Sequence, residues 1–187
     1  MNRPIETTPS DWTYSEYARL PDDGNRYEVI DGEVLVTPAP TPHHQKMVGR
    51  LLVMLIEYVE GRGLGWVFQD VDLLFVTGQF LRPDLVVVPA AARDGISDRG
   101  VEVAPALVVE VPSPSSGTID RVTKPRRYLD FGVPACWVVD PFEGVICMWD
   151  AKTGPDAPRR ETGIAQWSLA GADVAFDADV RRLIAPL

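Results

Sequence analysis

Two short apolar stretches, each carrying one acidic residue, constrain the fold of this chain more than any other feature. They are RPDLVVVP, residues 82–89, and LVVEVPSPS, residues 107–115, and proline ends the apolar run of both. A short apolar run bounded by turn residues is typical of a strand that is buried on both faces of a sheet. Helices must then cover the sheet, so we predict an α/β (α+β) fold with a central mixed sheet flanked by helices.

The remaining hydrophobic patterns place other elements around these two strands. An Asp31-Gly32 turn between alternating stretches predicts an N-terminal β-hairpin. A helical apolar face predicts a helix over residues 43–62, and Gly132 is suited to end a second helix over 119–131. Further strands are predicted at 66–76 and 81–88, as one hairpin, and at 106–111, 135–140 and 144–149. The tail after Ile164 is predicted to add more strand and a short terminal turn.

Length and composition limit the possible classes of protein. The 187 residues are predicted to form a single domain, 1–187, with its core at about 27–150 and a C-terminal extension at 151–187. The chain has no apolar run of membrane-spanning length and a polar start, which argues against a membrane span and a signal peptide. The hairpin register predicted for 135–149 leaves its two cysteines only diagonal neighbours, so we expect reduced thiols and a cytoplasmic protein. The net charge of −9 disfavours a general nucleic-acid coat protein, although basic residues cluster at 121–127.

The acidic residues inside the two apolar runs call for a partner. If the strands are neighbours, Asp84 and Glu110 meet in a dry sheet, where two carboxylates repel unless a cation lies between them. Hard oxygen ligands suit Mg²⁺ or Mn²⁺. The alternative is that Asp84 only begins its strand and that Glu110 pairs with an arginine.

The order of elements and motifs resembles the PD-(D/E)XK nuclease superfamily. More closely, the chain is similar to the bacterial family described as "putative restriction endonuclease", formerly a domain of unknown function. The matching segments are YEVIDGEVLVTPAPTPHHQ, RPDLVVV, LVVEVPSPS and DRVTKPRRYLDFGVPACWVVDP, which span about residues 27–141. The resemblance implies a restriction-endonuclease-like core, Mg²⁺ or Mn²⁺ as cofactor and DNA as partner. We also expect a homodimer.

The resemblance assigns roles to individual residues. It implies that Asp84, Glu110 and the carbonyl of Val111 hold the metal. The superfamily lysine two positions after the strand acid is replaced here by Pro112, and Lys124 on the following helix matches the branches in which this lysine has moved. Lys124 would orient or deprotonate the attacking water or bind the phosphate, unless it is only a solvated helix lysine beside Asp120. Pro125 can kink the helix and so affect the direction of Lys124.

Four further residues are candidates for the site. Glu28, on the first hairpin strand, is predicted as the upstream acid, although hairpin acids are more often solvated. His44 and Gln45 match the family and are candidates to line the cleft, as is Arg121. Tyr128 and Asp140 are interpreted as scaffold. The function expected is Mg²⁺-dependent hydrolysis of DNA; the alternatives are a non-catalytic nucleic-acid- or partner-binding module with this fold, and a metal-dependent phosphoesterase of small substrates.

Overall fold

The computed structural model describes residues 12–75, 78–113, 117–150, 153 and 156–185. A central sheet has the strand order β12-β11-β10-β9-β6-β3, and a second has the order β2-β1-β5-β4-β8-β7. The strands of the central sheet are β3 (Gly65–Gln69), β6 (Leu85–Pro89), β9 (Leu107–Glu110), β10 (Ala135–Asp140), β11 (Val145–Asp150) and β12 (Arg159–Glu161). The strands of the second sheet are β1 (Arg26–Ile30), β2 (Glu33–Thr37), β4 (Leu73–Phe75), β5 (Gln79–Leu81), β7 (Ile96–Ser97) and β8 (Gly100–Val101).

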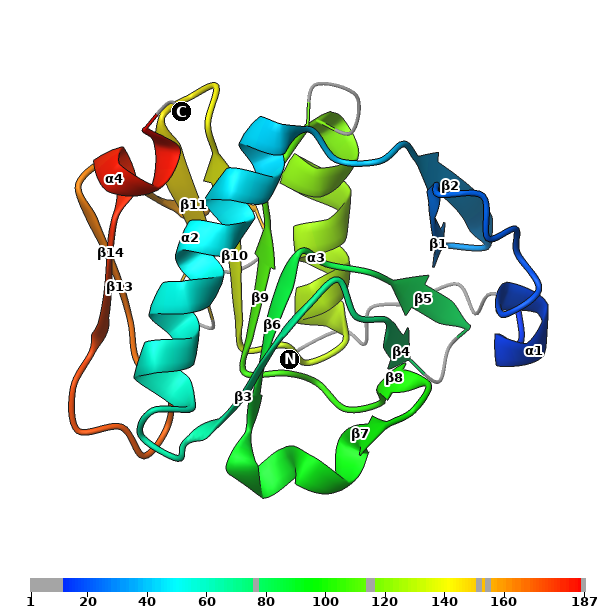
Figure 1. The fold of residues 1–187 in the computed structure, drawn as a ribbon, viewed down its shortest axis with the longest axis horizontal. Coiled ribbons are helices and arrows are strands. Elements are labelled where there is room, and N and C mark those ends of the chain that lie inside the picture. The colour runs from blue at the N-terminus through cyan, green and yellow to red at the C-terminus, as the bar shows by residue number, and fades with distance from the viewer. Residues whose placement is uncertain (1–11, 76–77, 114–116, 151–152, 154–155, 186–187) are drawn as a thin grey trace.

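Helices cover both faces of the central sheet, as the apolar runs predicted (Figure 1). Helix α2 (Pro42–Val59) packs with Leu85 and Val109 on one face, and α3 (Lys124–Asp130) packs Tyr128 with Val86 and Val108 on the other. This alternation follows from the two-residue period of a strand. The predicted fold class is therefore confirmed, with parallel pairing of β9 and β10 and antiparallel pairing of β6 and β9.

The predicted N-terminal hairpin is present as β1 and β2. Asp31 and Gly32 form its turn with φ of 53° and 85°, the left-handed values that a two-residue turn of this kind requires. Two ion pairs join the hairpin to α3, because Arg127 binds Asp31 at 2.6 Å and Lys124 binds Glu28 at 2.8 Å.

The predicted hairpin of two long strands, 66–76 and 81–88, needs correction because each arm divides between the two sheets. The register is nevertheless unbroken, since Gln69 faces Leu85 in the central sheet and Leu73 faces Leu81 in the second sheet. The hairpin bends between these pairs, where Asp70 has a φ of 53°. One bent hairpin thus links the sheets, and residues 70–72 and 82–84 lie at the bend.

The predicted helix over 119–131 has two parts. Residues Ile119–Thr123 form a π-helical turn, and α3 follows with Pro125 in its first turn. Proline has no N–H for the helical hydrogen bond to the residue four positions earlier, which accounts for a break at this point. Gly132, with φ of 85°, follows the end of the helix as predicted.

The ends of the described chain pack onto this core. Helix α1 (Tyr14–Tyr17) begins with the capping box of Thr13 and Glu16. The tail forms a two-stranded ribbon, β13 (Ile164–Trp167) and β14 (Phe176–Asp179), followed by α4 (Val180–Ile184), which confirms the predicted strand and turn. The two cysteines, Cys136 and Cys147, are free and buried. Among the described residues, the helices are too short or too polar to span a membrane.

Candidate active site

The acids of the two apolar runs lie next to each other at one end of the central sheet, where β6 begins and β9 ends. Leu85 faces Val109 in the antiparallel pairing of β6 with β9, and extending this register by one residue places Asp84 opposite Glu110. Opposite residues of an antiparallel pair project from the same face of a sheet. Both side chains are buried, with 3% and 1% exposure.

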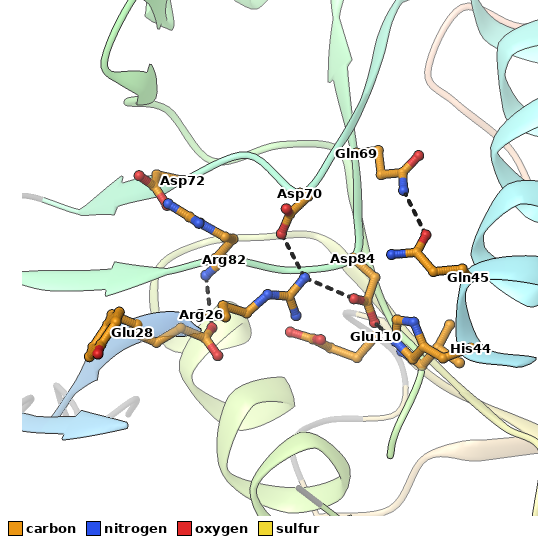
Figure 2. Close-up of polar contacts among 12 residues, drawn as sticks. Arg26, Glu28, His44, Gln45, Gln69, Asp70, Asp72, Arg82, Asp84 and Glu110 are labelled. Carbon is orange, nitrogen blue, oxygen red and sulfur yellow. Dashed lines mark hydrogen bonds and ion pairs between the residues drawn. The ribbon is translucent and has the colours of Figure 1, made fainter. Parts of the chain in front are cut away.

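Asp84 is bound by cationic and neutral donors from three directions (Figure 2). Its Oδ1 lies 3.1 Å from Nη2 of Arg26, and its Oδ2 lies 3.2 Å from Nε2 of His44. The backbone N–H of Val111 donates to Oδ2 at 2.7 Å. Burial raises the pKa of Asp84, but His44, Arg26 and the Val111 N–H outweigh burial and lower this pKa below its usual value. Asp84 is therefore held as a carboxylate.

Lys124 lies at the centre of a group of buried carboxylates. Its Nζ is 2.8 Å from Glu28, 3.2 Å from Asp120 and 3.3 Å from Glu110. Only 2% of the lysine is exposed, so the alternative of a solvated helix lysine is wrong. Burial lowers its pKa, but the three carboxylates outweigh burial and hold the pKa of Lys124 well above its usual value.

A π-helical turn, Ile119–Thr123, immediately precedes Lys124. Asp120, four positions earlier, forms an i,i+4 ion pair with the lysine. Because Nζ of Lys124 is held among carboxylates, Pro125 does not direct it into solvent. Single π-turns occur often at functional sites.

Glu110 and Glu28 complete the buried group. Oε1 of Glu110 accepts a 2.5 Å hydrogen bond from the hydroxyl of Tyr128, which was predicted only as scaffold. Burial raises the pKa of Glu110 well above its usual value; Lys124 opposes this shift, and neighbouring acids reinforce it. Glu28 is 1% exposed, not solvated, and its Oε1 accepts from the backbone N–H of Arg82 at 2.8 Å.

Two cavities are lined in part by Asp84. One has a volume of about 220 Å³ and the other about 240 Å³, and both are lined by Arg26, His44 and Asp84. Lys124 and Asp120 line the first, and Gln45 lines the second, where it accepts a 3.4 Å hydrogen bond from Gln69. His44 and Gln45 thus line the cleft, the position for which the sequence made them candidates.

Arg121 is not brought into this group. Its Nε donates to Asp140 at 2.5 Å, and its guanidinium lies 5.8 Å from the centre of the Phe142 ring, beyond the end of β10. The structure therefore places the guanidinium of Arg121 against the turn after β10, where it supports the scaffold.

Arg26 is the residue that the sequence reasoning missed. It lies two positions before Glu28 on β1, and residues i and i+2 of a strand share a face. Once Glu28 was predicted as a site residue, this spacing was the available signal for Arg26.

The donor set of the cleft fits a hard divalent ion. Within the part of the chain that the structure describes, the four buried carboxylates Glu28, Asp84, Glu110 and Asp120 form ion pairs with two permanent cations, Arg26 and Lys124. Among the described residues no three His, Cys, Asp or Glu side chains are arranged as a ready metal cluster. Mg²⁺ is usually held by one or two carboxylates together with water and phosphate oxygens, so Asp84, Glu110 and the Val111 carbonyl are donors of the right kind. That one ion bridges them stays a prediction.

Comparison with known proteins connects this geometry to a family. A family with the description "Putative restriction endonuclease", Uma2, matches residues 14–172. A crystal structure from Anabaena variabilis ATCC 29413, of "a putative nuclease belonging to DUF820", has a TM-score of 0.75 and 16% identity. The alignment covers 92% of this chain and 97% of that chain. No curated protein matches the sequence.

Proposed function

This chain belongs to the Uma2 family of "Putative restriction endonuclease" proteins, and from this premise we propose that it is a Mg²⁺-dependent endonuclease hydrolysing DNA phosphodiester bonds. The observation that carries the proposal is that Asp84, Glu110 and Lys124 lie together where β6 begins and β9 ends. A cavity lined by Asp84 and Lys124 lies beside them and can receive a substrate. Two acids and a lysine in this arrangement suit hydrolysis of a phosphate ester.

Each residue of the site has a proposed task. Asp84, Glu110 and the carbonyl of Val111 would hold the ion. Bound Mg²⁺ or Mn²⁺ supplies Lewis-acid polarisation of the phosphate and lowers the pKa of water. Lys124, kept charged by its neighbours, would stabilise the developing negative charge or orient the attacking water, and it is poorly suited to accept a proton.

The surrounding residues would keep these groups in place. Glu28 and Asp120 hold the ammonium of Lys124 from two sides. Tyr128 holds Oε1 of Glu110, and His44 holds Oδ2 of Asp84. A site fixed in this way loses little order when substrate arrives, which favours catalysis.

Cleavage assays with matched variants test the proposal. We expect the wild-type protein to cut supercoiled plasmid or oligonucleotide DNA in Mg²⁺ or Mn²⁺ but not in EDTA. Asp84→Asn and Glu110→Gln should reduce cleavage by about a hundredfold or more and weaken Mn²⁺ binding in calorimetry. Asp130→Asn, which changes an equally buried acid paired with Arg127 outside the cleft, should leave cleavage intact. DNA binding without cleavage in either metal would instead support the non-catalytic module.

A second candidate is hydrolysis of a small phosphate ester. The net charge of −9 and the modest volume of both cavities favour a small substrate over a long polyanion. Turnover of bis(p-nitrophenyl) phosphate by a protein that leaves plasmid and oligonucleotides uncut would select this candidate.

A further inference from the structure

Arg26 joins an exposed carboxylate to the buried one of the cleft. Its Nη2 lies 2.8 Å from Oδ1 of Asp70 and 3.1 Å from Oδ1 of Asp84, as Figure 2 shows. The side chain of Asp70 is 55% exposed, and that of Asp84 is 3% exposed. The guanidinium therefore has one partner in solvent and one at the centre of the site.

The two permanent cations described in the cleft, Lys124 and Arg26, pair with different carboxylates. Lys124 contacts Glu28, Glu110 and Asp120, whereas the permanent cation on Asp84 is Arg26. A divalent ion that binds Asp84 must therefore approach a guanidinium within 3.1 Å of the same carboxylate. Like charges at such a distance repel, so the ion and Arg26 compete for Asp84.

We propose that Arg26 is the phosphate-binding residue of the cleft, paired with Asp84 until a divalent ion replaces it there. This inference rests on the proposed function and adds to it a residue that binds substrate. When the ion takes Asp84, Arg26 keeps its pair with Asp70 and turns its charge toward the phosphate beside the ion.

The geometry around the guanidinium supports this role. Both of its ion pairs with described residues use Nη2, so release of Asp84 frees one Nη2 N–H, which lies parallel to a neighbouring N–H of Nε or Nη1. A planar guanidinium donates two parallel hydrogen bonds to a phosphate, which an ammonium cannot do. Arg26 also lines both cavities, so a phosphate bound to it would lie at a surface that a substrate can reach.

Metal binding without turnover tests the displacement. In calorimetry with Mn²⁺ and no DNA, Arg26→Gln should bind the ion roughly tenfold more tightly than wild type, because the competing charge is gone. Asp70→Asn changes an exposed residue and should weaken Mn²⁺ binding, because Asp84 is then the one carboxylate among the described residues that pairs with Arg26. Arg127→Gln is the matched control, since Arg127 also pairs with two carboxylates at similar exposure, and it should leave Mn²⁺ affinity unchanged.

DNA binding tests the phosphate role. In Ca²⁺, under conditions without cleavage, Arg26→Gln should bind a short duplex about tenfold more weakly, with a salt dependence lower by about one phosphate contact. Arg26→Lys keeps the charge, so its Mn²⁺ affinity should stay near that of wild type while DNA binding is weakened. If Arg26→Gln fails to fold, the DNA affinity of Arg26→Lys tests the phosphate-binding role.

If Arg26 has this role, Arg26→Gln changes the two affinities in opposite directions: Mn²⁺ binds more tightly and DNA binds more weakly. Unchanged or weaker Mn²⁺ binding by Arg26→Gln, or unchanged DNA binding, would overturn it and mark Arg26 as a structural link to the hairpin. Absence of Mn²⁺ binding by the wild-type protein would overturn the proposed function itself, together with the displacement that depends on it.

Discussion

At the scale of single residues, the most consequential group is the ammonium of Lys124. A buried cation with three carboxylate partners costs free energy to desolvate, and its partners are left with uncompensated charge if it is removed. Catalytic and structural roles therefore coincide in one side chain, and variants at this position must be tested for folding before activity.

Lys124→Ala should be strongly destabilising. We expect the free energy of unfolding at pH 7 to fall by about 3–5 kcal/mol, because buried carboxylates lose their cation. Urea denaturation followed by circular dichroism measures this change. Lys46→Ala, on the exposed side of α2, should change stability by less than about 0.5 kcal/mol. Equal stabilities for the two variants would show that Lys124 is not buried among its partners in solution.

Glu110→Gln should have the opposite effect on stability. In EDTA the melting temperature should stay the same or rise, because the substitution removes one of four buried carboxylates that share two permanent cations. Asp130→Asn offers the contrast, because Asp130 pairs with Arg127, a cation that it shares only with Asp31 among the described residues. This variant should lower the melting temperature. A clear loss of stability in Glu110→Gln would identify Glu110 as half of a structural ion pair.

At the scale of elements, the turn from β10 to β11 depends on one carboxylate. Oδ1 of Asp140 accepts from the backbone N–H groups of Phe142 and Glu143, and Oδ2 accepts from Arg121. Burial raises the pKa of Asp140, but these hydrogen bonds outweigh burial and lower the pKa below its ordinary value of 3.8. The charged form is therefore the one that stabilises the fold.

The contribution of Asp140 should depend on pH in a defined direction. Because its pKa is lower in the folded state, its stabilisation is complete above about pH 4 and is lost as the pH falls through the folded-state pKa. Asp140→Asn should lower the free energy of unfolding by roughly 1–2 kcal/mol at pH 7. Urea titrations at a series of pH values should show the difference shrinking toward acid. A difference that is constant with pH would contradict the charged role.

Two glycines, one inside a helix and one just after a helix, should respond oppositely to substitution by alanine. Gly49 lies inside α2 with open space where a Cβ would be, so Gly49→Ala should stabilise the fold by about 0.5–1 kcal/mol. Gly132 also has open space, but its φ of 85° strains any other residue, so Gly132→Ala should destabilise by about 1 kcal/mol. Thermal unfolding of the pair isolates the effect of backbone conformation, because neither added Cβ meets another atom within 4 Å.

At the scale of the whole molecule, the sequence predicted the elements well and their division between sheets poorly. The Asp31-Gly32 turn and the apolar runs around Asp84 and Glu110 have strong local signals, and these predictions were confirmed. The bend of the central hairpin was missed because its register is continuous. The change of sheet depends on residues far along the chain, which local patterns do not describe.

The candidate site was predicted in part, for the same reason. Asp84 and Glu110 stand out as charges within apolar runs, and Lys124 and Glu28 were found through the resemblance to a family. The carboxylate partners of Lys124 come from β1, β9 and the π-helical turn, and Arg26 pairs with Asp70 and Asp84 at the bend. The spacing from Glu28 points to Arg26, but local patterns do not describe these contacts between distant segments.

The two ion pairs between the first hairpin and α3 have a consequence for the motions of the protein. Glu28 and Asp31 belong to the hairpin, and their partners, Lys124 and Arg127, lie one helical turn apart on α3. Residues joined in this way tend to open and close as one cooperative unit in hydrogen exchange. We expect backbone amides of β1 and α3 to exchange at matching rates, and Asp31→Asn to speed exchange in β1 while β9 and β10 stay protected. Local unfolding of the hairpin would then separate Glu28 from Lys124. Access to the cleft would therefore depend on an equilibrium that the charges of the site itself help to set.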